Sequence, residues 1–109
     1  MNLFIQEAAQ QDILRQVEWY ADKGLPDIAR RFYAAVLDAI DALQTMPDAG
    51  PQKLSGNPHL AGLRSWPVGD FHELRVYYLV RPGMLSIVRV LHGKRDIGAI
   101  LDREEPQEP

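Results

Sequence analysis

The sequence predicts an α+β domain in which a short N-terminal strand and an antiparallel helical hairpin pack on a small, mainly antiparallel sheet. Apolar residues recur at steps of three and four through residues 7–43, which is the spacing of one helix face. Strand-like runs separated by a tight-turn sequence fill residues 63–92. At 109 residues, the chain is expected to form a single domain over residues 1–103, followed by a disordered acidic tail at residues 104–109.

The first half of the chain predicts an edge strand and two helices. Residues 3–6 form a short apolar run, and residues 7–23 then carry one apolar face that ends at Gly24. Pro26 can begin a second helix without losing a hydrogen bond, and so short a connection requires the two helices to be antiparallel. The apolar face of the first helix is Ala9, Ile13, Val17 and Tyr20, and that of the second is Ala29, Phe32, Val36, Ile40 and Leu43.

A loop and two strands are predicted next. Residues 46–61 are rich in Pro, Gly, Ser and Asn, which predicts an exposed connection. Residues 63–68 are interrupted by Pro67, so this strand is expected to be short or to lie at a sheet edge. Residues 71–80 alternate between two faces, as a strand requires.

The chain is then expected to turn back for a final strand. Residues 81–84 have Pro at the second position and Gly at the third, which favours a tight turn. Residues 85–92 are nearly all apolar, which predicts a central place in the sheet. Residues 97–101 are long enough for one helical turn or a strand end.

The composition argues against several classes of protein. The chain has no cysteine, so it can form neither a disulfide nor a thiolate metal site. It begins without the features of a signal peptide and has no run near the roughly 20 apolar residues of a membrane span, so a soluble cytoplasmic protein is expected. The histidines at 59, 72 and 92 lack metal-ligand spacing and no phosphate-binding glycine loop is present, so neither a metal nor a cofactor is expected.

Charge is distributed unevenly along the chain. Residues 1–52 hold eight acids and four bases, giving −4, whereas residues 53–103 hold four acids and eight bases, giving +4. The tail adds −3, for a net charge of −3. Strong direct binding to nucleic acid is therefore not expected, but the basic half could meet an acidic protein partner. The alternative is that these bases are the solvated charges of an exposed sheet face.

Three motifs carry a family resemblance: LRSWPVG at residues 63–69, LRVYY at 74–78 and VRVLHGKRDI at 88–97. They resemble the sheet of the ParE toxins, in the RelE/ParE superfamily of type II toxin–antitoxin systems. The resemblance implies a RelE/ParE-like fold and a bacterial toxin that inhibits DNA gyrase, and so blocks replication, without being an enzyme. It also implies a ParD-like antitoxin that wraps the toxin. The family's poisoning region maps here to Arg95, Asp96, Ile97, Ile100 and Leu101.

Two other functions stay open. An mRNA endoribonuclease of the RelE type would use His92 as general acid or base, with Arg64, Arg89 or Arg95 stabilising the developing charge. Alternatively, His92 has a structural role, donating to a backbone carbonyl or pairing with Asp96 as the chain leaves the sheet. A non-toxic member of the family that only binds its antitoxin is the third reading.

Antitoxin-binding residues are expected among exposed aromatic side chains and the bases of the second half. Trp19 lies off the apolar stripe of its helix, and aromatic residues with a polar tip are favoured at interfaces. A core position is the alternative for each aromatic residue. The predicted antitoxin-binding residues are Trp19, Arg64, Trp66, Arg75 and Tyr77.

Overall fold

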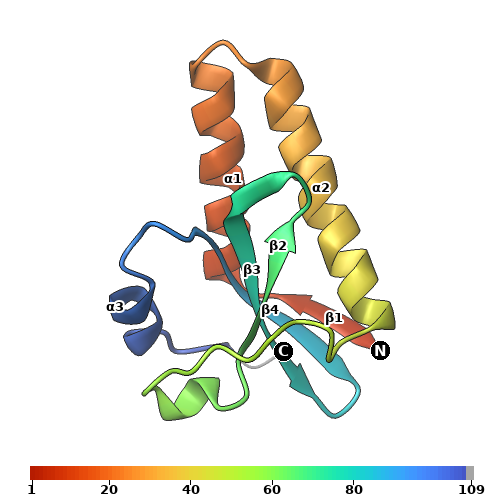
Figure 1. Cartoon of the computed structure of the whole chain (residues 1–109), viewed down its shortest axis with the longest axis vertical. Coiled ribbons are helices and arrows are strands. Elements are labelled where there is room, and N and C mark those ends of the chain that lie inside the picture. The colour runs from red at the N-terminus through yellow and green to blue at the C-terminus, as the bar shows by residue number, and fades with distance from the viewer. Residues whose placement is uncertain (108–109) are drawn as a thin grey trace.

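In the computed structural model, which describes residues 1–107, four strands form one sheet and two long helices cover one of its faces (Figure 1). The elements in chain order are β1 (Asn2–Ile5), α1 (Glu7–Asp22), α2 (Pro26–Thr45), the 3-10 turn η1 (Pro58–Leu60), β2 (Arg64–Val68), β3 (Phe71–Arg81), β4 (Met84–His92) and α3 (Ile97–Asp102). The strand order is β1, β4, β3, β2. β1 pairs with β4 in parallel and the other pairs are antiparallel. The predicted fold class is confirmed, with β1 and β2 at the edges and β4 in a central position.

α1 ends and α2 begins where the sequence predicts. Gly24 has φ of +75°, a left-handed conformation that glycine adopts without steric cost. The N–H of Leu25 donates to the carbonyl of Tyr20 at 2.9 Å, which closes the end of α1, and Pro26 is the first residue of α2.

None of the helices in residues 1–107 has both the length and the apolar content needed to cross a membrane.

The main core lies between the hairpin and the sheet. Tyr20, Phe32 and Phe71 form an aromatic cluster in it: Phe32 meets Phe71 edge to face with their ring centroids 5.6 Å apart, and the tilted ring of Tyr20 lies 5.8 Å from that of Phe32. The predicted apolar stripes of both helices face this core. Its fully buried members include Ala9, Phe32, Val36, Val68, Val76, Tyr78, Leu85 and Ile87.

The hairpin of β3 and β4 contains an irregularity. Gly83 has φ of +70° in the predicted turn. Tyr77 pairs with Arg89 and Tyr78 with Ile87, so Val88 has no partner on β3. Such a bulge bends a strand and increases its local twist. Beyond it, Arg89 lies where it can reach both α1 and the C-terminal segment.

A second apolar cluster lies on the opposite face of the sheet, under α3 and η1. Tyr77 and Leu79 of β3 and Val88 and Leu91 of β4 form its floor, and α3 covers it. α3 is a helix because Asp96 caps it, accepting a hydrogen bond from the N–H of Ala99 at 3.1 Å. Both faces of β3 are therefore buried. The remaining members of the cluster are Leu60, Leu63, Ile97 and Leu101.

Residues 46–61 are not simply an exposed connection, and this expectation is corrected in part. The N–H of Gly50 donates to the buried Tyr78 hydroxyl at 2.9 Å, and that hydroxyl donates to the carbonyl of Pro47 at 2.7 Å. The N–H of Lys53 also donates to the carbonyl of Leu63 at 2.8 Å. The loop therefore partly covers the edge of β2.

The described part of the C-terminal tail packs on the domain, unlike the disordered tail that its composition predicted. The Gln107 N–H donates to the Gln6 side chain at 2.7 Å, and the Gln6 amide donates back to the Gln107 carbonyl at 3.1 Å. Glu104 contacts Arg89. Composition missed these contacts because their partners lie far away in the sequence. Residues 108–109 lie outside the described part of the chain.

Candidate functional site

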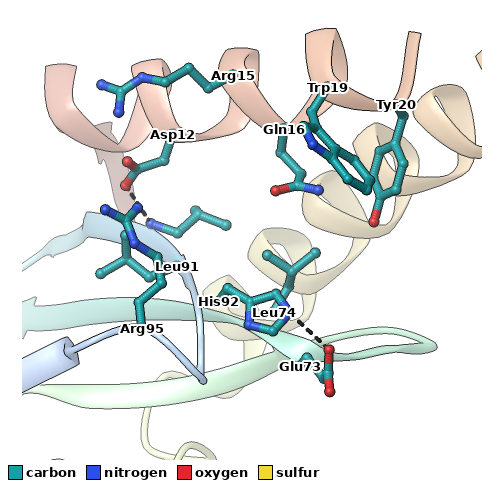
Figure 2. A pocket seen from close by; sticks show the side chains of 11 residues that line it. Asp12, Arg15, Gln16, Trp19, Tyr20, Glu73, Leu74, Leu91, His92 and Arg95 are labelled. Carbon is teal, nitrogen blue, oxygen red and sulfur yellow. Dashed lines mark hydrogen bonds and ion pairs between the residues drawn. The ribbon is translucent and has the colours of Figure 1, made fainter. Parts of the chain in front are cut away.

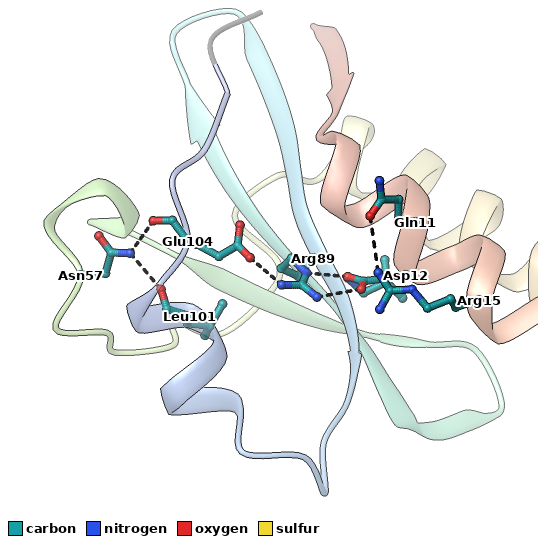
Figure 3. A network of polar contacts seen from close by, with 8 residues as sticks. Gln11, Asp12, Arg15, Asn57, Arg89, Leu101 and Glu104 are labelled. Carbon is teal, nitrogen blue, oxygen red and sulfur yellow. Dashed lines mark hydrogen bonds and ion pairs between the residues drawn. The ribbon is translucent and has the colours of Figure 1, made fainter.

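Arg89 forms a polar network that joins α1, β4 and the C-terminal segment (Figure 3). Its Nε and Nη2 donate to the two Asp12 oxygens at 2.7 and 2.8 Å, and its Nη1 donates to Glu104 at 2.5 Å. Asp12, only 7% exposed, also accepts the N–H of Val90 at 3.0 Å. The hydrogen bonds that Arg89 donates to Asp12, and then the one to Glu104, raise the pKa of Arg89. Arg89 is therefore held by two carboxylates and is not free to contact a phosphate.

His92 pairs with Glu73, not with Asp96 or a backbone carbonyl as the sequence had suggested. Its Nε2 lies 2.8 Å from a Glu73 oxygen, and its Nδ1 accepts the N–H of Lys94 at 3.2 Å. The other Glu73 oxygen lies 2.7 Å from Nζ of Lys94. The hydrogen bond from Lys94 is the main cause that lowers the pKa of Glu73. His92 thus fastens the end of β4 to β3.

A cleft of about 600 Å³ lies between α1 and the end of the sheet (Figure 2). The α1 side chains form one wall, and those of β3, β4 and the following turn form the other. Trp19 is 52% exposed, and Nζ of Lys23 lies 5.6 Å from the centre of its ring. The lining residues are Asp12, Arg15, Gln16, Trp19, Tyr20, Glu73, Leu74, Val90, Leu91, His92 and Arg95. The fold therefore brings together three of the residues predicted from sequence: Trp19, His92 and Arg95.

The other predicted antitoxin-binding residues lie on β2 and β3, away from this cleft. Arg64 donates to the carbonyls of Gly50 at 2.7 Å and Asp48 at 3.2 Å, and Arg75 donates to the Ser65 hydroxyl at 3.1 Å. Trp66 is partly buried and packs against the main core. Tyr77 is only 3% exposed, in the second cluster. Its prediction as an interface residue is therefore wrong for this structure, because α3 and η1 cover it.

The segment predicted to bind the target divides into buried and exposed residues. Ile97 and Leu101 hold α3 on the sheet and are buried, so they are not available to a partner. Ile100 is partly buried against the same cluster. Arg95 and Asp96 are exposed, although Asp96 is also used to cap α3.

An apolar groove on the outer side of the hairpin was not predicted as a site. Leu14 is 57% exposed, Tyr33 50% and Leu37 46%, and together they border a hollow of about 540 Å³ between α1 and α2. The remaining lining residues are Ile5, Gln10, Ile13, Val17 and Ile40. The available sequence signal was that Leu14, Tyr33 and Leu37 fall beside the buried stripes. A contiguous exposed apolar surface of this kind is typical of a protein interface.

Comparisons with known proteins agree with this fold. The sequence model of one family, described as the ParE toxin of the type II toxin–antitoxin system parDE, matches residues 3–97. The structure is similar to a solved chain described as "Chromosomal ParDE TA system from P. aeruginosa", with a TM-score of 0.68 and 17% identity. That match covers 84% of this chain and 95% of the other. No curated protein sequence matches this chain.

Proposed function

Because the chain belongs to the ParE toxin family of type II toxin–antitoxin systems, we propose that it is a toxin that inhibits DNA gyrase and so blocks DNA replication. A ParD-like antitoxin neutralises it by direct binding. The observation that carries this proposal is the family match over residues 3–97, which covers the sheet except Asn2 and all three sequence motifs. The bacterial cytoplasm, where gyrase acts on DNA, is the proposed location.

Two observations support inhibition without catalysis. Arg89 is held by Asp12 and Glu104, and His92 by Glu73, so neither stands free beside a reacting phosphate. On β3, Arg64 pairs with Tyr78 and His92 with Leu74, four residues apart, which separates the two pairs by roughly 13 Å along the strand. A ribonuclease that used His92 with Arg64 or Arg89 would need them to converge on one phosphate, and of the three arginines only Arg95 lines a cleft with His92. RNA cleavage is therefore the weaker candidate.

Antitoxin binding is supported by the apolar groove between α1 and α2. An amphipathic helix could lay its apolar face between Leu14 on one side and Tyr33 and Leu37 on the other, which is a common mode of peptide recognition. Trp19, Arg64, Trp66 and Arg75 remain proposed antitoxin contacts outside this groove.

Target binding is proposed for the exposed part of the segment after β4. Arg95, Asp96 and Ile100 have at least partly accessible side chains there. The buried Ile97 and Leu101 have a supporting role, because they hold α3 against the second cluster.

The decisive experiment incubates the purified chain with DNA gyrase, ATP and supercoiled plasmid, and measures plasmid cleaved after protein digestion. We expect cleaved plasmid to accumulate, and added antitoxin to prevent this. A matched reaction without gyrase controls for DNA cleavage by the chain itself. Absence of accumulated cleavage, from a folded chain that still arrests growth, would refute gyrase poisoning and make RNA cleavage the next activity to test.

A further inference from the structure

The cleft beside α1 carries positive charge that the described residues do not neutralise. Its two carboxylates already have cationic partners, since Asp12 binds Arg89 and Glu73 binds Lys94. Arg15 and Arg95 are exposed, and neither forms an ion pair within residues 1–107. Arg15 donates only a long hydrogen bond, 3.4 Å, to its neighbour Gln11. Two guanidinium groups that have no ion pair in the described part of the chain therefore come from opposite walls of one cleft.

The side chains that line the cleft favour a peptide carboxylate over the phosphates of a nucleic acid. A run of phosphates needs many neutralising bases, whereas this cleft offers only Arg15 and Arg95 and the chain carries a net charge of −3. A single carboxylate can be bound by one guanidinium in a two-point contact, which is the geometry that arginine favours. The exposed Trp19 ring offers an apolar surface beside it. An acidic segment with at least one apolar side chain fits these walls.

The cleft and the apolar groove lie on the two sides of the same helix. Ile13, Leu14 and Val17 of α1 line the groove, whereas Arg15, Gln16 and Trp19 line the cleft. An α-helix with its side chains is about 10–12 Å across. An extended chain would need about three or four residues to cross it. One continuous partner can therefore occupy both sites.

We propose that the cleft receives an acidic segment of the antitoxin, joined by a short linker to the apolar helix that lies in the groove. This inference rests on the proposed function and identifies a second contact for the same partner. It also suggests how neutralisation works. Arg95 belongs to the segment proposed to contact the target, so an antitoxin carboxylate bound there would compete directly with gyrase.

The test measures binding of the full chain to the ParD-like antitoxin encoded beside its gene, by calorimetry over a salt series from about 0.05 M to about 0.5 M. We expect Arg15→Glu and Arg95→Glu each to weaken binding by about tenfold to hundredfold at low salt, and to reduce its salt dependence. Arg30→Glu is the matched control. Arg30 is exposed on α2, and its substitution makes the same charge reversal outside the cleft and the groove. Leu37→Asp should weaken binding at every salt concentration, since it acts in the groove.

A second readout follows Trp19 in a Trp66→Phe chain, where its fluorescence is free of the other tryptophan. Because Trp66 is itself a proposed antitoxin contact, the antitoxin affinity of this chain is first compared with that of the wild type by the same calorimetry. Bound antitoxin should shift the Trp19 emission to shorter wavelength, and Arg15→Glu should reduce that shift. Wild-type affinity in both arginine variants, with a loss only in Leu37→Asp, would overturn the cleft assignment and leave the proposed function standing. An equal loss of affinity in Arg30→Glu would also overturn the cleft assignment, because the loss would then reflect attraction between the net charges of the two proteins. No binding by the wild-type chain would overturn both proposals.

Discussion

Replacing Asp12 by alanine tests whether the Arg89 network holds the domain together. Asp12 is 7% exposed and accepts two hydrogen bonds from Arg89 and one from the Val90 N–H. The substitution removes all three. It leaves the Val90 N–H without its acceptor, and it leaves Arg89, whose side chain is only 12% exposed, bound to Glu104 alone.

The expected loss of unfolding free energy in Asp12→Ala depends on which charges remain paired. Removing one partner of a buried ion pair typically costs about 3–5 kcal/mol, because the other charge is left buried without compensation. Arg89 keeps Glu104, so the lower end, about 3 kcal/mol, is expected for Asp12→Ala. Glu104→Ala should cost about 1 kcal/mol, because the two-point contact between Arg89 and Asp12 remains. Glu18→Ala, an exposed change on the same helix, should cost under about 0.5 kcal/mol.

The assay is equilibrium unfolding in urea, followed by circular dichroism and tryptophan fluorescence to check that the transition is two-state. For a domain of this size, a loss of about 3 kcal/mol also lowers the melting temperature by more than about 10 °C. A loss below about 1 kcal/mol for Asp12→Ala, or a loss no larger than that of Glu104→Ala, would refute the reasoning that Asp12 is the main anchor of Arg89.

Three further predictions concern the loop, the end of β4 and the tail. Gly50→Ala should destabilise the domain by at least about 2 kcal/mol in urea unfolding, because the added Cβ would lie 2.5 Å from the Ser65 carbonyl oxygen and from the Tyr78 hydroxyl. Gly56→Ala is the control and should be near neutral, because its Cβ meets nothing within 4 Å. The hydrogen bond from Lys94 lowers the pKa of Glu73 below its ordinary value of 4.5. The ionised carboxylate therefore stabilises the folded chain fully above about pH 4.5, and this stabilisation is lost as the pH falls through the lowered pKa. The difference in unfolding free energy between wild type and Glu73→Gln should therefore shrink from about pH 7 to about pH 3, and a constant difference would count against the contact with Lys94. Ending the chain after Arg103 should lower stability by about 1–2 kcal/mol, seen as a lower melting temperature, because the hydrogen bonds that Arg89 donates to Glu104 and that the Gln107 N–H donates to Gln6 are lost. An unchanged melting temperature would favour a tail that does not pack.

The sequence alone was enough to predict α1, α2, the four strands and the family, but it left open whether residues 97–101 form a helical turn or a strand end. The apolar stripes of α1 and α2 were readable because a helix repeats every 3.6 residues. The central place of β4 followed from its nearly continuous apolar run, and the edge position of β2 from Pro67. The three motifs in the sheet were enough to predict the family that the match over residues 3–97 shows.

Only the tertiary structure decided which elements cover each face of the sheet and which charged side chains are already paired. Alternation along β3 separated Tyr77 from Tyr78, but it could not show that α3 and η1 bury Tyr77 on the second face. Arg89 and Asp12 are 77 residues apart, and no local pattern records such a pair. A sequence pattern reports which side of one element is apolar, whereas partners, clefts and free charges depend on where distant elements meet. That is why Arg15 became a candidate for partner binding and Arg89 did not.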